Sequence, residues 1–464
     1  MTLLIYGYEQ VTDSQSQQMR AARWQIIYWI FVVLRLLRSS ALKEDRINSD
    51  VAWTVDLRRP YEQGKQLTKS KIRTIHPFPA RMAPDLALVS LERLPSGSRV
   101  LDPMSGSGTV IRHALELGHH AVGFDLDPLA ILMSKVWTTE IRDSDIEKEM
   151  IRLKRLVSDM GDEVPVLAWQ ADPETAKFLD YWFYDTQRRD LARVASALHT
   201  RRAGDLSSHE LAAVDALRVA FSRIIITKEQ CASLARDTSH SRPHRVATDS
   251  QYEVMPNFER SVVQLRQRLA ESPPPGTANV TRGDARALDL EGASIDAVIT
   301  SPPYLNAIDY LRGHRMSLVW LGHSIPELRA VRSNSIGSER NADSHDRRVD
   351  VDAVVTAMRG TAALRGRIEG IIERYALDLL GMAAEVSRVL KPGGSATYVV
   401  GNSCIKGTFI NNAQGVAESA RLAGMNLVEM RERNLPVANR YLPVTGDSLS
   451  KRMRTETILV CKKA

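Results

Sequence analysis

Short apolar runs alternate with longer amphipathic segments along the chain from Ser96 onward. Arg99–Leu101 has the pattern of a buried strand, and a glycine-rich turn separates it from a helical pattern over Val110–Leu117. Ala121–Phe124 then repeats the strand pattern, and Pro128–Trp137 repeats the helical one. Strands that alternate with helices in this way predict βαβ units and a parallel sheet.

The alternation stops between Glu140 and Pro275, where the chain is charged and its pattern is helical. This segment includes a polar, basic stretch at Ser239–Arg245, and it ends in the proline run Ser272–Gly276, which is typical of a linker. We therefore expect a large, mainly helical insert in the sheet.

The strand pattern resumes after the proline run. A helix over Ile371–Leu390 should end at Lys391-Pro-Gly-Gly394, because proline and glycine stop helices. The basic, polar stretch Arg329–Arg348 predicts a loop. Further strands are expected at Asn279–Thr281, Ala297–Thr300, Ala396–Val400, Asn426–Met430 and Thr457–Val460, of which the last two should pair antiparallel.

An uncharged apolar run, Trp24–Leu34, lies near the N-terminus between Arg23 and Arg35. It is shorter than the roughly 20 apolar residues that a membrane-spanning helix needs. No small-residue cleavage pattern follows it, which argues against a secretory signal. We expect a buried or packed element and no stable membrane insertion; the alternative is a leader outside the working domain.

The composition is that of a soluble globular protein, with 44% hydrophobic and 25% charged residues among 464. The formal net charge of +7 suits a polyanionic partner, although many basic proteins bind no nucleic acid. Three cysteines, Cys231, Cys404 and Cys461, lie far apart in sequence. Their number and spacing indicate neither a disulfide framework nor a metal site, and they favour a reducing, cytoplasmic location.

The turn after the first strand is a candidate binding site for a nucleoside cofactor. Its glycines allow a tight backbone turn close to a ligand, and the following helix offers free N–H groups at its N-terminus. A dinucleotide or a phosphate would also suit such a turn, although neither signature is complete. The candidate residues are Asp102, Pro103, Gly106, Ser107, Gly108 and Thr109.

Three residues outside this turn complete the candidate cofactor site. Asp125 ends the second strand, where a carboxylate can accept hydrogen bonds from ribose hydroxyls; the alternative is a turn or cap residue, a role that better suits Asp127. Phe78, in the stretch His76–Met82, can offer apolar contact from a lid, or the stretch is a plain turn into a helix. Asp284 follows a third strand and can bond an adenine amino group, or it is a plain turn residue.

Ser301-Pro-Pro-Tyr304 directly follows the apolar strand Ile295–Thr300. Two prolines fix the backbone and remove two donors, so this segment belongs at a strand end that faces a cleft. A rigid strand exit without any catalytic role is the alternative explanation.

Together these motifs resemble those of the amino-group DNA methyltransferases, whose signature is [DNS]-P-P-[YFW], and the serine is typical of the cytosine-N4 branch. Asp102–Thr109 is similar to the family's cofactor loop D-P-F-x-G-S-G-T, with Met104 where phenylalanine is usual. Asp125 matches the ribose acid, and Phe78-Pro-Ala80 matches the element before the cofactor loop in permuted members. The resemblance covers roughly residues 70–137 and 277–464.

The resemblance implies a Rossmann-like α/β sheet, mostly parallel with one antiparallel strand, that binds S-adenosyl-L-methionine. It divides the chain into a leader (1–70), a cofactor-binding half (71–139), a helical insert (140–277) and a catalytic half (278–464). Ser301 Oγ and the Pro302 carbonyl would accept the protons of an exocyclic amino group. Pro303 would keep the segment rigid, and Tyr304 would stack on a base flipped out of double-stranded DNA.

The expected activity is site-specific methylation of cytosine N4 in DNA, as the modification component of a restriction-modification or related defence system with or without a cognate endonuclease. Adenine-N6 methylation and, less favoured, RNA guanine-N2 methylation are the alternatives. Carbon-5 methylation of cytosine is unlikely, because it needs a cysteine nucleophile, normally after proline, and no Pro-Cys occurs. The insert is the candidate for target recognition, and the expected DNA contacts are Arg242, Arg245, Arg312 and Arg315. The alternatives are a purely structural helical subdomain for the insert and a solvated basic face for Arg312 and Arg315.

Overall fold

The computed structural model describes residues 72–78, 82–236, 243–305, 309–338, 348–360, 367–405, 408–434 and 455–464. All of them belong to the second of two units, Ser70–Ala464. The apolar run Trp24–Leu34, Arg242 and residues 339–347 of the expected basic loop lie outside the described residues.

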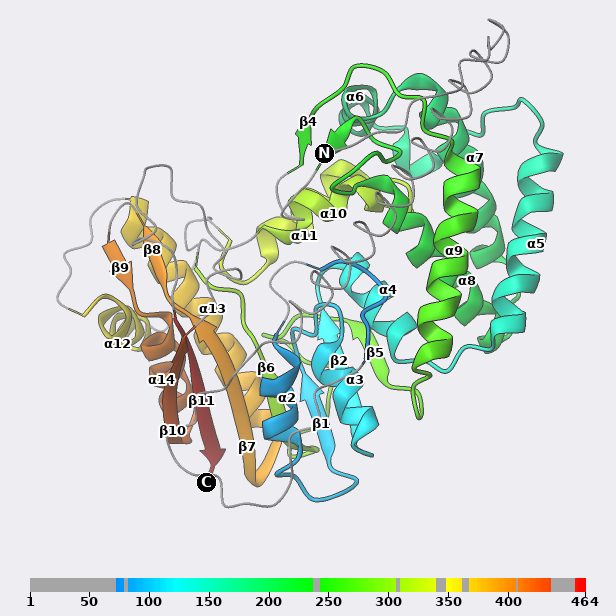
Figure 1. The fold of residues 1–464 in the computed structure, drawn as a ribbon. Coiled ribbons are helices and arrows are strands. Elements are labelled where there is room, and N and C mark those ends of the chain that lie inside the picture. Colours follow the sequence, from blue (N-terminus) through cyan, green and yellow to red (C-terminus); the bar gives the residue numbers. More distant parts are fainter. Residues whose placement is uncertain are drawn as a thin grey trace, which may run out of the picture. The chain divides into compact units, whose positions relative to one another are not determined.

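A seven-stranded sheet organises this unit, in the order β10-β11-β7-β6-β1-β2-β5 (Figure 1). All neighbouring strands are parallel except β11, which runs antiparallel to both β7 and β10. The expected fold class and the antiparallel pairing of the last two strands are thereby confirmed. The strands are β1 (Arg99–Asp102), β2 (His120–Asp125), β5 (Asn279–Arg282), β6 (Ile295–Thr300), β7 (Leu390–Gly401), β10 (Met425–Asn434) and β11 (Thr455–Lys463).

Helices cover both faces of the sheet. Successive residues of a strand point to opposite faces, so neighbouring residues pack against different helices. Val100 packs in a cluster with α2 and α3, whereas the next residue, Leu101, packs in a cluster with α12, α13 and α14. The inner strands are therefore buried on both faces, which explains their continuous apolar runs. These helices are α2 (Pro84–Leu91), α3 (Thr109–Glu116), α12 (Arg348–Arg359), α13 (Arg367–Val389) and α14 (Asn412–Leu422).

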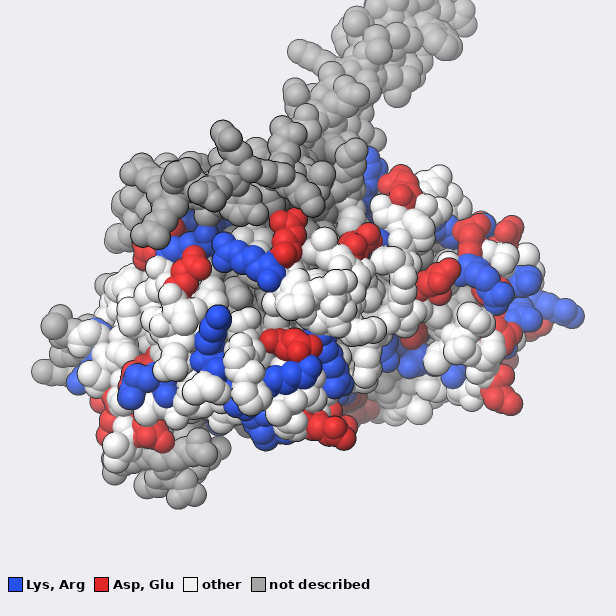
Figure 2. Space-filling model, turned by 90° about the horizontal axis from the view of Figure 1, so that it is seen from below, with Lys and Arg blue, Asp and Glu red and all other residues white. Residues whose placement is uncertain are grey.

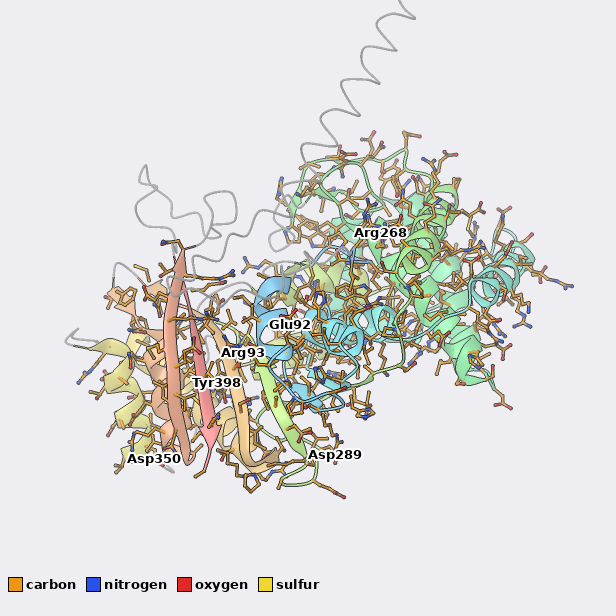
Figure 3. All side chains as sticks on the ribbon, turned by 60° about the horizontal axis from the view of Figure 1, so that its bottom comes forward. Glu92, Arg93, Arg268, Asp289, Asp350 and Tyr398 are labelled. Carbon is orange, nitrogen blue, oxygen red and sulfur yellow. The ribbon has the colours of Figure 1, made fainter. Side chains whose placement is uncertain are left out.

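The insert between α4 (Pro128–Trp137) and β5 is mainly helical, as its charge and spacing predict. Phe221 of α8 and Phe258 of α9 meet edge to face with ring centroids 5.6 Å apart. Arg268, on α9 (Figure 3), donates from Nη1 to the carbonyl of Thr74 at 2.6 Å and so fixes the segment that leads to Phe78. The helices are α5 (Asp143–Asp159), η2 (Ala168–Gln170), α6 (Pro173–Trp182), α7 (Asp185–Ala203), α8 (Ser208–Ile225) and α9 (Val254–Glu271).

The core of the insert continues into elements on either side of it in sequence. Leu129 and Met133 of α4 belong to the same hydrophobic cluster as the insert helices. Met316 of α10 (Tyr310–Leu318) and the buried Trp320 just after this helix belong to it as well. None of the described helices combines the length and apolar character that crossing a membrane requires.

Two expectations about local structure are wrong in part. Arg329–Asn334 is helical, as the second half of α11 (Ile325–Asn334), because Ser324 caps this helix and a proline stands in its first turn. Lys391-Pro-Gly-Gly394 ends α13 as expected, but it already belongs to β7. The pairing of β7 with β6 shifts register there, and Lys391 Nζ reaches Asp296 Oδ1 at 2.6 Å.

Two short ladders complete the described secondary structure. β3 (Ala235–Arg236) pairs with β4 (His244–Arg245), so the end of the basic stretch of the insert forms a strand. β8 (Ser403–Ile405) pairs with β9 (Thr408–Ile410) just beyond the end of β7.

Candidate active site

The glycine-rich turn connects the end of β1 to the start of α3, and two of its residues have left-handed backbones. Gly106 has φ 50° and Gly108 has φ 88°. A Cβ on Gly106 would lie 3.1 Å from the Phe78 ring, and one on Gly108 would lie 2.5 Å from Ser134 Oγ. Glycine is therefore required at both positions by conformation and by space.

Asp125 lies at the carboxyl end of β2, beside this turn. Its Oδ2 accepts the N–H of Gly106 and its Oδ1 accepts the N–H of Asp127, both at 2.9 Å. Burial, and then the neighbouring Asp127 carboxylate, raise the pKa of Asp125 to about 6. Each carboxylate oxygen has a further lone pair, so Asp125 can both shape the turn and accept from ribose hydroxyls.

Asp102 joins the ends of two strands. Its Oδ1 accepts from Thr300 Oγ1 at 2.7 Å and from the N–H of Met104 at 3.2 Å. Burial raises the pKa of Asp102 to about 7. Because Thr300 immediately precedes Ser301, this hydrogen bond fixes the cofactor turn against the start of the catalytic segment.

Phe78 packs over the turn together with two side chains of α10. Its ring stacks on Tyr310 at 5.4 Å with an interplanar angle of 18°, and it lies 5.4 Å from the ring of His314. His314 Nδ1 lies 2.5 Å from Asp127 Oδ2, while Asp127 Oδ1 caps α4 as expected. The sequence does not reveal the His314–Asp127 pair, because 187 residues separate its members.

Asp284 is engaged by a neighbouring arginine. Its Oδ1 accepts from the backbone N–H and from Nε of Arg286, both at 2.9 Å, and its Oδ2 accepts from Nη2 at 2.6 Å. Arg286 also pairs with Asp378 of α13. These contacts match the turn alternative, and the contact of Asp284 with adenine stays a prediction.

The segment that follows β6 is held in place by three side chains from distant elements. Tyr375 of α13 donates its hydroxyl to the carbonyl of Pro303 at 2.9 Å. Ser403 donates its hydroxyl to the carbonyl of Leu305 at 2.6 Å. Tyr304 donates its own hydroxyl to Glu456 Oε1 at 3.3 Å.

Burial, followed by the carboxylate of Glu456, raises the pKa of Tyr304 well above its ordinary value, so the phenol stays protonated. Among the described residues, no hydrogen bond to the carbonyl of Pro302 is found. The tetrapeptide thus combines a fixed ring with an available acceptor.

The two candidate segments meet at one edge of the sheet. β1 and β6 are neighbours, with Val100 opposite Ala297 and Leu101 opposite Val298. The strand order reverses there, because β2 and β5 lie on one side and β6 and β7 on the other. Crevices at such reversals, beyond the carboxyl ends of parallel strands, are where α/β folds bind ligands. The glycine-rich turn and Ser301–Tyr304 follow these two neighbouring strands at that reversal.

Two of the expected DNA-contacting arginines lie against aromatic rings of α6. The guanidinium of Arg245, on β4, lies 5.0 Å from the ring centroid of Tyr181, and that of Arg315, on α10, lies 5.2 Å from that of Phe178. Burial lowers the pKa of Arg315. Arg312 is exposed and lies 3.7 Å from Asp309 Oδ2. Their contact with DNA stays a prediction.

The donor set suits a nucleoside cofactor better than a metal. The two glycines keep side chains out of the turn, and Asp125 has carboxylate lone pairs that can accept from a diol. Over the described ranges, no group of three or more His, Cys, Asp or Glu side chains is arranged to hold a metal ion. The three cysteines are free thiols.

The chain is similar to several Type II methyltransferases. M.MvaI of Kocuria varians is 22% identical over 427 residues, which cover 85% of this chain and 92% of that protein. M.BsoBI of Geobacillus stearothermophilus is 22% identical over 68% of this chain and 71% of its own length. M.MjaII of Methanocaldococcus jannaschii is 30% identical over 118 residues, 25% of this chain and 20% of that protein. No protein-family model matches the chain.

Solved structures give weaker likenesses. An S-adenosylmethionine-dependent methyltransferase of Methanosarcina mazei aligns with 81% of this chain and 96% of its own, at 10% identity and a TM-score of 0.29. A geranyl diphosphate methyltransferase aligns with 82% of this chain and 78% of its own, at 8% identity and a TM-score of 0.33. The fold assignment therefore rests on the strand order and directions described above.

The resemblance read from the motifs is confirmed by relatives that match along most of the chain, and the sheet has the strand order that the resemblance implies. The chain is therefore similar, along most of its length, to Type II methyltransferases, and its mostly parallel sheet with one antiparallel strand is the Rossmann-like sheet that this similarity implies.

Proposed function

We propose that this protein transfers a methyl group from S-adenosyl-L-methionine to the exocyclic N4 of cytosine in double-stranded DNA. The observation that carries the proposal is the position of Ser301-Pro-Pro-Tyr304 beside the cofactor turn at the reversal of strand order. The relatives named as Type II methyltransferases support DNA as the substrate.

The residue types suit methylation of an exocyclic amino group. Its nitrogen is a poor nucleophile because the lone pair is delocalised into the base, and attack requires the nitrogen to become pyramidal. Ser301 Oγ and the Pro302 carbonyl would accept the two amino protons and direct the lone pair into the crevice. The bound cofactor supplies an electrophilic methyl group on its sulfonium. The work of the enzyme is then mainly positioning and electrostatic stabilisation.

Tyr304 would act through its ring. Because its hydroxyl is bonded to Glu456, the ring has a fixed orientation in which a base flipped out of the duplex can stack on it. Serine at position 301 favours cytosine N4 over adenine N6, which remains the second candidate. RNA guanine-N2 methylation is the third, favoured only by a similar cofactor loop.

The proposal extends to the surroundings of the crevice. Arg245 and Arg315 both lie on aromatic rings of α6, and they are the candidates for phosphate or base contacts from the insert side. A cognate restriction endonuclease is a proposed partner in the cell, in line with the Type II relatives.

The decisive experiment is mass spectrometry of nucleosides from unmethylated plasmid DNA after incubation with the protein and methyl-deuterated cofactor. Deuterated N4-methylcytosine is expected, and the Ser301→Ala variant is expected to yield almost none. Deuterated N6-methyladenine instead would reassign the target base. Label in RNA but not in DNA would contradict the proposal as a whole.

A further inference from the structure

We propose that Tyr375 is a positioning residue that sets the one free backbone angle between the Pro302 carbonyl and the Tyr304 ring. This inference rests on the proposed function, which makes the carbonyl an acceptor of amino protons and the ring a stacking surface for the target base. Tyr375 lies on α13, and its hydroxyl donates to the carbonyl of Pro303, 72 residues away in sequence, at 2.9 Å.

Tyr375 is itself held in place by its surroundings. It is 1% exposed and packs in the hydrophobic cluster of α12, α13 and α14. Burial raises the pKa of Tyr375, so its hydroxyl stays a donor at any assay pH. One turn further along α13, the Asp378 carboxylate accepts the N–H of Gly337 at 3.2 Å. A Cβ on Gly337 would lie 3.7 Å from the Tyr375 ring and 3.5 Å from the carbonyl oxygen of Tyr304, so α13, Gly337 and the tetrapeptide pack directly against one another.

A contact at Pro303 can govern the groups on either side of it because the tetrapeptide has few free angles. Each peptide unit is planar, so the angle between the Pro302 carbonyl and the next peptide unit depends only on φ and ψ of Pro303. The pyrrolidine ring fixes φ at about −65°. The remaining angle, ψ, sets the direction of the Pro303 carbonyl, which is the group that Tyr375 holds. Among the described residues, no other hydrogen bond to this carbonyl is found.

The geometry of methyl transfer depends on this angle. A base that stacks on Tyr304 presents its amino group to the Pro302 carbonyl only when ring and carbonyl keep their relative orientation. Without the Tyr375 hydroxyl, the Pro303 carbonyl loses its donor and ψ can vary, although Glu456 still holds the Tyr304 hydroxyl. The base would still bind, but it would reach the reactive alignment less often. Such a misalignment lowers the rate of the chemical step.

Tyr375→Phe tests this inference on the full-length protein, with unmethylated plasmid DNA and the methyl donor both saturating. The change keeps the ring and removes only the hydroxyl. The single-turnover rate is expected to fall roughly tenfold, the effect of one lost hydrogen bond, while cofactor Kd and the KM for DNA stay within about twofold of wild type. Tyr398→Phe is the matched control and should leave the rate unchanged. This β7 tyrosine (Figure 3) is also fully buried, and its hydroxyl has no hydrogen-bond partner among the described residues.

A double-mutant cycle with Tyr304→Ala separates positioning from a general loss of stability. Without the Tyr304 ring there is no alignment to keep, so adding Tyr375→Phe should lower the rate by less than about twofold. A loss of stability would instead multiply with the loss from Tyr304→Ala, and Tm is measured on every variant. An unchanged rate in Tyr375→Phe, a loss in Kd and KM alone, or a full second loss in the double variant overturns the inference. A wild-type protein that methylates no DNA contradicts the proposed function instead.

Discussion

Two buried carboxyl groups, at the ends of β1 and β2, have pKa values shifted toward neutrality. Asp102 titrates at about 7 and Asp125 at about 6, and burial is the main cause for both. The charge of Asp125 adds to the upward pKa shift of Asp102. The protonation of the cofactor site therefore changes within a pH range that is easily tested.

Cofactor affinity is predicted to fall as the pH is lowered through about 6. Asp125 is ionised above this value, and protonation below it removes part of its capacity to accept from ribose hydroxyls. Isothermal titration between pH 5.5 and 8 measures the effect. Asp125→Ala should bind weakly at every pH, and a wild-type Kd for this variant would rule out the ribose contact.

Replacing Ser301 or Tyr304 by alanine is predicted to separate binding from chemistry. Cofactor Kd should stay within about threefold of wild type, while methyl transfer falls by about 10²–10³, the usual cost of losing an acceptor or stacking partner in the transition state. Single-turnover methylation and titration calorimetry measure the two quantities. An equal loss of both would mean that these residues do not act on the target base.

The geometry of the candidate site was predictable where local sequence dictates it. Gly106 and Gly108 have the left-handed backbones that their turn predicts. Tyr375 and Glu456 were not predictable, because each contacts the tetrapeptide across a large sequence separation, 152 residues for Glu456. No short pattern around them indicates such a partner.

At the scale of elements, the packing of α3 against α4 depends on the absence of a side chain at Gly108. Gly108→Ala is predicted to destabilise the protein by more than Gly118→Ala. Both glycines have left-handed backbones, at φ 88° and 75°, so both variants carry strain of about 1–3 kcal/mol. Only at Gly108 would the new Cβ also meet Ser134, whereas the space at Gly118 is open.

Urea unfolding of both variants measures the difference directly. The matched strain cancels, so the remaining gap reports the clash with Ser134 and is expected at about 1–3 kcal/mol. Equal stabilities would show that the turn can move away from α4 without cost.

The elements of the first half were predictable because parallel strands buried on both faces give plain apolar runs, as in Ala121–Phe124. Two later boundaries were not. The basic, polar composition of Arg329–Arg348 led to the prediction of a loop where the second half of α11 lies. Ser324 and the proline in the first turn of this helix are nevertheless start signals of a helix. The glycines and proline after α13 also serve as a bulge at the start of β7, and spacing alone does not distinguish a bulge from a turn.

At the scale of the whole molecule, the net charge of +7 contributes to DNA binding only where the basic groups can reach phosphates. Figure 2 shows a face on which Lys and Arg are interspersed with Asp and Glu, not a continuous basic patch. This face lies at the amino ends of the parallel strands, away from the crevice. The DNA contacts are therefore expected on the side of α6, α10 and β4.

Salt is predicted to weaken DNA binding strongly and cofactor binding little. If Arg242, Arg245, Arg312 and Arg315 each neutralise one phosphate, DNA affinity should fall on the order of a hundredfold between 50 and 200 mM salt. Arg245→Ala should lower the slope of this dependence by about one unit. Arg421→Ala, in an exposed pair with Glu418 on α14, is the control and should leave the slope unchanged.

The continuous core beneath the insert limits how this enzyme can be re-engineered or diversify. Leu129, Met133, Met316 and Trp320 pack into the bundle from outside its sequence limits. If only residues 140–277 were exchanged with those of a relative, the new helices would pack against core side chains of α4 and α10 that do not match them. If the insert recognises the target sequence, transferring a new target preference would require α4 and α10 to be exchanged together with the insert. The aromatic and histidine side chains of α10 that pack with Phe78 over the glycine-rich turn would then be exchanged as well.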